Sequence, residues 1–349
     1  MAFWRIDLGG RGPGYALRDI LAPTQAATST ARLIAHVRPD ILVLSGLDYD
    51  HSLAALGALR DLVAEHGHDF QHFFARPSNA GLRHPAQAQS PRARTGPDDA
   101  QGYGRFAGSG ALALLTRYPV DLPELRDFSD FLWRDLPDSL IPERDDAWRR
   151  TQRLSSTGHW DVPVILDSGQ RLHLLIYQAG PPVFGDAHHT NRLRNHDETA
   201  FWTAYLDARL AVPPPAGPLV VMGGSNLDPH DGDGLHQAMR ALLTHPRLQD
   251  PQPSSDGARH AAHTQKDRAH LGPPELDTVH WPQDRGPGNL RVSYILPSVG
   301  LRVTGSGVFW PHPDVPEYAY LGAADSPPTR HRLVWVDIDR ASLAGEVLN

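Results

Sequence analysis

The sequence predicts an α/β protein in which two packed β-sheets are covered by helices. Short apolar runs bounded by turn residues indicate buried strands at residues 41–44, 110–115 and 219–222. A segment that ends near Val37 and residues 53–66 have the composition of helices. Many strands and few helices follow one another in an irregular order, which favours two sheets packed together.

The remaining elements follow from the same patterns. Further strands are predicted at residues 1–6, 161–166, 172–177, 290–296, 301–308 and 333–338, and a further helix at 195–210. Two segments rich in Pro, Gly and polar residues, 75–102 and 251–274, have no hydrophobic period and are predicted to be long surface loops. No internal repeat or linker divides the sequence, so residues 1–349 are predicted to form one domain.

Composition and charge exclude several classes of protein. The chain has 349 residues and no cysteine, so it has no disulfide and no thiolate nucleophile or metal ligand. No apolar run approaches the roughly 20 residues that span a membrane, and a net charge of −7 argues against a general nucleic-acid-binding protein. The first strand begins at Met1 with no secretory signal, so a soluble cytoplasmic protein is expected, although a processed exported form would have the same sequence.

Five motifs occur along the chain in a characteristic order. They are residues 38–44 (RPDILVL), 115–119 (LTRYP), 223–229 (GGSNLDP), 289–298 (NLRVSYILPS) and 330–334 (RHRLV). In this order they resemble the endonuclease/exonuclease/phosphatase superfamily, and in particular a bacterial subgroup of it. The resemblance implies a four-layer α/β/β/α sandwich of two mixed β-sheets flanked by helices, with the functional site at one edge.

The site that this resemblance implies is largely substituted. Hydrolysis of a phosphoester with Mg²⁺ needs oxygen ligands for the metal, a base for water and donors to the phosphoryl oxygens. In place of the implied Asn, Glu, His, Asp, Asp and Asp, this chain has Arg5, Gly46, Gln178, Gly224, Ser293 and Arg330, whereas Asn226 and His331 are retained. Gly46, Gly224 and Ser293 replace three carboxylates that would supply or orient the oxygens around the metal, so we expect no metal, no cofactor and no catalytic residue in this degenerate site.

The residues at these positions suggest a second use of the site. Asn226 and His331, with Arg330 and Arg5 adding positive charge, are candidates for binding a phosphate or another anion. An arginine in the place of a metal ion is physically reasonable because it neutralises the same acceptors. The structural alternative is that Asn226 caps a turn and His331 satisfies a hydrogen bond in the core.

Relocated ligands would restore a Mg²⁺ site. The candidates are Asp7, Asp48, Asp50 and Asp228, although carboxylates at strand ends are more often solvated or cap turns. Residues 231–234 (DGDG) are similar to the start of a calcium-binding loop, but the later ligands are absent and a turn is expected. Neither the His188–His189 pair nor His260, His263 and His270 have a recognisable framework of further ligands, so solvated loops are predicted there.

Three functions therefore stay open. The first is a pseudoenzyme that keeps the fold as a structural subunit and binds a protein partner, alone or within a larger assembly. The others are a Mg²⁺-dependent phosphoester hydrolase with relocated ligands, and a protein that binds a small anion or a nucleotide. For the first function, the candidate anchors are the side chains beside the two long loops: Phe73, Phe74, Arg76 and Trp281.

Overall fold

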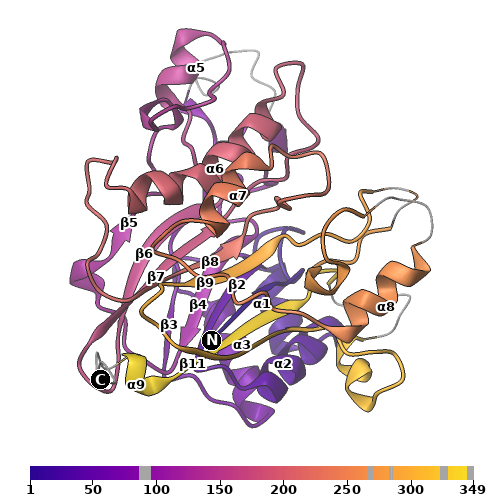
Figure 1. Cartoon of the computed structure of the whole chain (residues 1–349). Coiled ribbons are helices and arrows are strands. Elements are labelled where there is room, and N and C mark those ends of the chain that lie inside the picture. Colours follow the sequence, from indigo (N-terminus) through magenta and orange to yellow (C-terminus); the bar gives the residue numbers. More distant parts are fainter. Residues whose placement is uncertain (86–95, 266–269, 283, 285, 323–328, 344–349) are drawn as a thin grey trace.

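The computed structural model describes residues 1–85, 96–265, 270–282, 284, 286–322 and 329–343. Its strands form two mixed β-sheets (Figure 1). The six-stranded sheet has the order β10 (Val303–Phe309), β11 (Leu333–Ile338), β1 (Ala2–Arg5), β2 (Ile41–Leu47), β4 (Ala111–Thr116), β3 (His72–Phe74). The five-stranded sheet has the order β5 (Arg126–Asp127), β6 (Gly158–Ile165), β7 (Arg171–Gln178), β8 (Leu219–Gly224), β9 (Ser293–Pro297).

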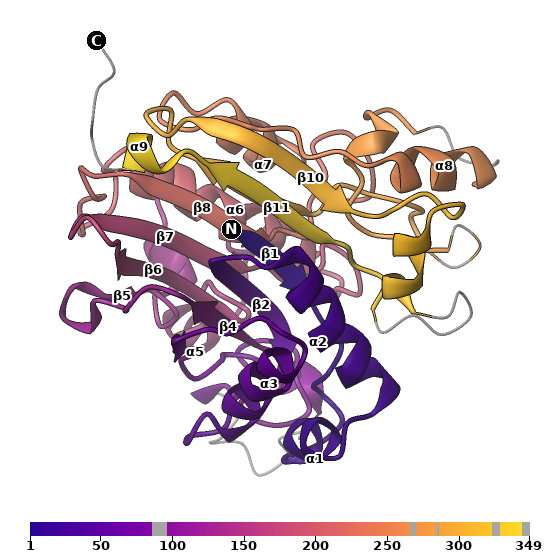
Figure 2. The same ribbon diagram turned by 90° about the horizontal axis from the view of Figure 1, so that it is seen from below.

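Each sheet contains one parallel pair among antiparallel neighbours. β1 runs parallel to β2, and β7 runs parallel to β8. The two sheets pack face to face, with β1 against β8 and β9. Figure 2 shows the two layers of strands, with α2 and α3 outside the first sheet. The predicted sandwich of two mixed sheets flanked by helices is confirmed.

The helices occupy the outer faces of the sandwich. α1 (Tyr15–Leu21), α2 (Gln25–Val37) and α3 (Ala54–Glu65) lie on the six-stranded sheet, and α6 (Thr190–Leu206) and α7 (Gln237–Leu243) on the five-stranded sheet. Shorter helices are α5 (Asp146–Thr151), α8 (Asp256–Thr264) and α9 (Arg340–Leu343), and the 3-10 turns are Pro97–Asp99, Leu122–Glu124, Trp133–Asp135, Pro274–Leu276 and Pro316–Leu321. Within the described residues, no helix is both long and apolar enough to cross a membrane.

The centre of β7, residues 174–177, is a continuous apolar run. Leu174 and Ile176 point into the core between the sheets, whereas Leu175 and Tyr177 pack beneath α6. Both faces of the strand are therefore buried, and a continuous apolar run replaces the alternation of a half-exposed strand. This arrangement places the carboxyl ends of β7 and β8 side by side at one edge of the sandwich.

The prediction of a long loop at residues 251–274 is wrong in part, because α8 lies within it. The Ser255 hydroxyl accepts a hydrogen bond from the Ala258 amide at 3.2 Å and caps this helix. Its buried face consists of the small residues Gly257, Ala258 and Ala261. No large apolar residue marks this face, which is why the sequence pattern indicated a loop.

The other predicted loop, 75–102, is irregular where it is described but is not simply solvated, and residues 86–95 lie outside the described part. Ser78, Asn79 and Ala80 are buried. The Asn79 side-chain amide donates to the main-chain oxygens of Ser129 and Ser155, at 2.5 and 2.8 Å. The first part of this segment is therefore tied to the loops at the edge of the five-stranded sheet.

Candidate functional site

The family positions predicted from the sequence meet at one edge of the sandwich. Gln178 at the end of β7 pairs with Gly224 at the end of β8, and Gly224 pairs with Ser293 at the start of β9. In the other sheet, Arg5 pairs with Ser45 at the ends of β1 and β2. The Ser45 hydroxyl donates a 2.8 Å hydrogen bond to Gln178 Oε1 and so joins the two sheets at this edge.

Gly46 has a backbone conformation that excludes a side chain. Its φ is +88°, in the left-handed region that favours glycine. A Cβ atom at this position would lie 1.9 Å from the main-chain oxygen of Ile6. The pairing of β2 with β4 also shifts register between Ser45 and Leu47, on either side of this residue. A glutamate here would require the backbone of two strands to move.

Gln178 fills the space that a side chain at position 224 would need. A Cβ atom on Gly224 would lie 2.3 Å from Gln178 Oε1 and 2.9 Å from Cδ. The Gln178 side chain is 2% exposed, and its Nε2 donates to the main-chain oxygen of Ala179 at 2.9 Å. Gln178 is thus a satisfied structural residue, and a side chain at position 224 would require its amide group to move.

The two retained residues are also part of the packing. Asn226 has a φ of +50°, and its side-chain amide donates to the main-chain oxygen of Ala179 at 2.7 Å. His331 is 7% exposed, its ring lies 5.5 Å from that of Trp281, and its Nδ1 has no hydrogen-bond partner among the described residues. Burial, together with the charges of Arg5 and Arg332, lowers the pKa of His331 well below its ordinary value. The imidazole is therefore neutral.

The carboxylates considered as relocated Mg²⁺ ligands are committed to the backbone. Asp48 Oδ1 accepts from the amides of Gly10 and Gly110, at 2.7 and 2.9 Å, whereas Asp48 Oδ2 is buried and has no hydrogen-bond partner among the described residues. The Asp50 carboxylate accepts from two amides at the start of α3. Asp228 accepts from three main-chain amides, including that of Arg291 at 2.7 Å.

The donor set at this edge does not fit Mg²⁺. Asp7, the remaining candidate ligand, is exposed. The described residues contain no group of three His, Asp or Glu side chains placed to hold a metal ion. Side chains also lack space at Gly46 and Gly224. The described residues therefore offer no set of oxygen ligands for the octahedral coordination of Mg²⁺.

The candidate partner anchors have different environments. Phe74 is buried and packs edge-on against Trp160 with ring centroids 5.6 Å apart, so it is a core residue and not a surface anchor. Phe73 is half-buried beneath the Arg60 guanidinium, and Arg76 is exposed. Trp281 is half-buried against a small cluster that includes Val279, as well as against His331.

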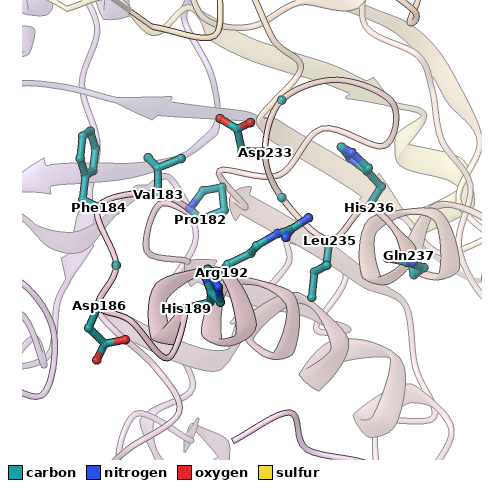
Figure 3. A pocket seen from close by; sticks show the side chains of 13 residues that line it. Pro182, Val183, Phe184, Asp186, His189, Arg192, Asp233, Leu235, His236 and Gln237 are labelled. Carbon is teal, nitrogen blue, oxygen red and sulfur yellow. The ribbon is translucent and has the colours of Figure 1, made fainter. Parts of the chain in front are cut away.

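A surface cleft of about 540 Å³ lies beyond the ends of β7 and β8. It is formed by residues 182–186, the start of α6 and residues 232–237. Phe184 is 88% exposed with a φ of +63°, an unusual conformation for a bulky residue. Figure 3 shows the Arg192 side chain extending from α6 toward the turn that carries Asp233 and Leu235. Sequence reasoning identified the 231–234 turn but not the cleft, because its other wall comes from a separate loop.

The polar face of α6 holds these loops in place and was also missed. Glu198 is fully buried and accepts from the Ser156 hydroxyl and amide, both at 2.6 Å, and from the Gly180 amide at 2.8 Å. Asn195 donates to the main-chain oxygens of Gly180 and Ser225, both at 2.7 Å. Burial raises the pKa of Glu198. The helix was predicted to begin at residue 195, because the polar residues before it conceal its inward face.

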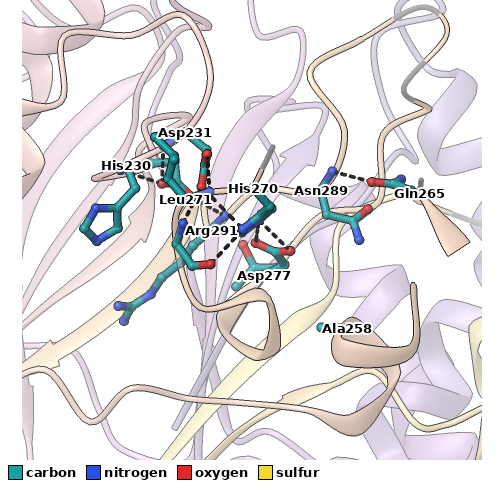
Figure 4. A network of polar contacts seen from close by, with 12 residues as sticks. His230, Asp231, Ala258, Gln265, His270, Leu271, Asp277, Asn289 and Arg291 are labelled. Carbon is teal, nitrogen blue, oxygen red and sulfur yellow. Dashed lines mark hydrogen bonds and ion pairs between the residues drawn. The ribbon is translucent and has the colours of Figure 1, made fainter. Parts of the chain in front are cut away.

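His270 belongs to a second polar network, so the prediction of a solvated loop is wrong for this histidine. Its Nε2 lies 3.2 Å from the Asp277 carboxylate, and its Nδ1 lies 2.8 Å from the Gly272 main-chain oxygen and 3.5 Å from Asp231. Figure 4 shows the imidazole between the two carboxylates. The hydrogen bond with Asp277 is the main cause that raises the pKa of His270 to about 9. Burial raises the pKa of Asp277 to about 6.

The two-sheet sandwich, with its candidate site on the loops at one edge, defines the class of protein. A model of the Endonuclease/Exonuclease/phosphatase family matches residues 8–331, and the chain belongs to this family. No curated protein sequence matches the chain.

Solved structures share the fold at low identity. A family member from Beutenbergia cavernae is 15% identical with a TM-score of 0.55, over 97% of this chain and 70% of that one. A family protein from Leptotrichia buccalis is 14% identical with a TM-score of 0.52, over 97% and 99% of the two chains. A mannosyl-6-phosphatase from Bacteroides thetaiotaomicron is 14% identical with a TM-score of 0.52, over 97% and 98%. At these identities the likeness concerns the fold alone.

Proposed function

We propose that this chain is a non-catalytic member of its family that acts as a structural subunit and binds a protein partner. The observation that carries the proposal is the packing at Gly46, Gln178 and Gly224, which leaves no space for the carboxylates of a metal site. Loss of several catalytic groups together leaves little beyond binding. The cytoplasmic location expected from the sequence remains a prediction.

Hydrolysis is tested directly with the purified chain. We expect no turnover of p-nitrophenyl phosphate, bis-p-nitrophenyl phosphate or a sugar phosphate above the buffer rate with Mg²⁺ or Mn²⁺. Sugar phosphates are included because one structural neighbour is a mannosyl-6-phosphatase. The matched control is His331→Gln, which replaces the retained histidine. Metal-dependent turnover in the natural chain that this variant lacks would establish the alternative, a hydrolase with relocated ligands.

The cleft beside Phe184 offers the best-defined surface for a partner. The exposed ring presents apolar area, and aromatic and arginine side chains dominate the centres of protein interfaces. Arg192 is exposed and forms no ion pair with any residue that the structure describes. A complementary partner would therefore place an apolar side chain on Phe184 and a carboxylate near Arg192. A stable contact of this kind buries about 1,200–2,000 Å² in total.

Recovery of partners from the native source tests this surface. We expect the natural chain and a Val299→Ala control to recover the same specific protein, and Phe184→Ala to recover at least five-fold less. Val299 is a suitable control because it is also an exposed apolar residue, 62% exposed, and it lies in the β9–β10 connection. Equal recovery by all three chains would remove the cleft from the proposal, and absence of any specific protein would contradict partner binding.

A further inference from the structure

The turn that forms one wall of the cleft is anchored at its two ends. Asp228 Oδ1 accepts from two amides at the start of the turn, and His236 Nδ1 at its end lies 2.7 Å from the Asp228 main-chain oxygen. Among the described residues, none forms a hydrogen bond with residues 232–235 between these anchors. Gly232 has a φ of +81°, a conformation that glycine adopts readily. The position of this wall therefore depends on its neighbours.

One side chain joins the start of this turn to a separate segment. Asp231 accepts from the amides of Leu271 and Gly272, at 2.9 and 2.8 Å. The same carboxylate lies 3.5 Å from His270 Nδ1. On the other side of the imidazole, His270 Nε2 lies 3.2 Å from each oxygen of the Asp277 carboxylate. His270 thus connects the cleft wall to the segment that leads into the 3-10 turn Pro274–Leu276 (Figure 4).

Both carboxylates depend on His270 for a neighbouring positive charge. The Asp277 side chain is 1% exposed and that of Asp231 is 10% exposed. Within the described residues, His270 is the only side chain that forms an ion pair with either of them. Asp228 adds further negative charge beside Asp277, and the ring of His230 lies near Gly272 at the same turn. Loss of one member of a buried ion pair leaves an uncompensated charge, which is strongly unfavourable.

The positive charge of His270 is present at neutral pH. The hydrogen bond with Asp277 is the main cause that raises the pKa of His270 to about 9. The neighbouring Arg291 directs its guanidinium to Asp250, at 2.6 Å, and so does not pair with the two carboxylates beside His270. If the imidazole loses its proton, these carboxylates face one another across a neutral ring. Their mutual repulsion then favours separation of the two segments.

We propose that the protonated side chain of His270 is a clasp that fixes the turn at residues 231–234, and with it one wall of the cleft, against the segment 270–277. The same contacts place Leu271, which is 75% exposed, beside the turn that faces Phe184 across the cleft. A partner then meets a preformed surface and does not have to order the turn when it binds. His270 is thus a positioning residue. Its effect on partner binding rests on the proposed function, whereas the clasp itself does not.

A distance measurement tests the clasp without a partner. The chain has no cysteine, so Asp233→Cys and Ala208→Cys together provide the only two sites for nitroxide spin labels. Asp233 is exposed in the turn, and Ala208 is exposed at the end of α6 that lies away from the cleft. At about pH 7 we expect one narrow distribution of distances between the labels. A rise to about pH 10 should broaden the distribution about two-fold or more, with a midpoint near 9.

Variants at the clasp separate its charge from its packing. His270→Gln should give the broad distribution at both pH values, whereas His270→Arg keeps a cation between the carboxylates and should give the narrow one at both. Asp277→Asn removes the main cause of the raised pKa and should lower the midpoint by about one pH unit or more. His51→Gln is the matched control, because His51 is exposed, and it should titrate like the natural chain. Circular dichroism at each pH checks that every chain is folded.

Recovery of the partner then tests the link to the proposed function. At about pH 7, His270→Gln should recover about five-fold less of the specific protein than the natural chain, and His270→Arg about the same amount. Equal recovery by His270→Gln would contradict the link between the clasp and partner binding. If no chain recovers a specific protein, the proposed function fails and the distances alone decide on the clasp. A folded natural chain with the same distribution at both pH values, or equal broadening in His270→Arg, would overturn the clasp.

Discussion

Adding one methyl group to Gly224 tests the reasoning about the closed site. In Gly224→Ala, the new Cβ would lie 2.3 Å from Gln178 Oε1, so the glutamine side chain must move. Movement breaks its hydrogen bonds with the Ser45 hydroxyl and the Ala179 main-chain oxygen, at 2.8 and 2.9 Å. Overpacking costs about 1–3 kcal/mol and each lost hydrogen bond about 1 kcal/mol. We therefore expect the free energy of unfolding to fall by about 3–5 kcal/mol.

Removing the obstacle should remove this cost. In a Gln178→Ala background, Gly224→Ala meets no glutamine side chain and should cost less than about 1 kcal/mol. Gln178→Ala itself destabilises the protein, because it leaves a cavity and an unpaired Ser45 hydroxyl. The double-mutant cycle isolates the interaction between positions 178 and 224, and a coupling of about 2–4 kcal/mol is expected.

Two other glycines provide controls for this cycle. Gly46→Ala meets a main-chain oxygen and is strained by its φ of +88°, so it should destabilise the protein in both backgrounds by similar amounts. Gly300→Ala meets nothing within 4 Å and should have a small effect in both. Urea unfolding followed by tryptophan fluorescence and circular dichroism gives the free energies. A coupling between positions 178 and 224 below about 0.5 kcal/mol would refute the reasoning. So would a result in which Gln178→Ala reduces the cost of Gly46→Ala as much as it reduces the cost of Gly224→Ala.

Three further predictions concern other parts of the molecule. The raised pKa of His270, about 9, implies a contribution to stability that is present below pH 6.5 and lost as the pH rises through 9. Between these two pH values the free energy of unfolding should fall by about 1–3 kcal/mol more in the natural chain than in His270→Gln. His51→Gln is the control and should behave like the natural chain. Millimolar Mg²⁺ should leave the melting temperature unchanged. If Mg²⁺ instead raises the melting temperature of the natural chain but not that of Asp48→Asn or Asp228→Asn, these carboxylates are relocated metal ligands. Asp48→Ala should destabilise the chain by about 1–3 kcal/mol through two lost amide hydrogen bonds, whereas an equal loss in Asp48→Asn, which keeps the accepting oxygen, would contradict this explanation.

The sequence predicted the sandwich because burial of the strands is visible locally. Residues 174–177 are continuously apolar, and the structure buries both faces of that strand beneath α6 and between the sheets. Helices with unusual inward faces were predicted less well. The buried face of α8 is made of small residues, and the first buried residues of α6 are charged or polar, such as Arg194 and Glu198. Neither face is marked by large apolar residues at these positions, so α8 was not predicted and the start of α6 was placed too late.

The candidate site was predictable in its residues but not in its contacts. The positions of Gly46, Gln178 and Gly224 followed from the motifs, yet their mutual exclusion depends on register between strands far apart in sequence. The network of His270, Asp231 and Asp277 likewise joins separate loops. Burial and pairing of such polar groups are properties of the tertiary structure, and single residues in a polar segment carry no sign of them.

The substitutions at the family site depend on one another. Gly46 is required by the approach of the Ile6 main-chain oxygen, and Gly224 is required by the Gln178 amide, which in turn satisfies the Ser45 hydroxyl across the two sheets. Restoring a carboxylate at either glycine would cost several kcal/mol before any metal bound, and a domain is typically stable by only about 5–15 kcal/mol. Gly46→Glu and Gly224→Asp alone should therefore weaken the fold of the chain.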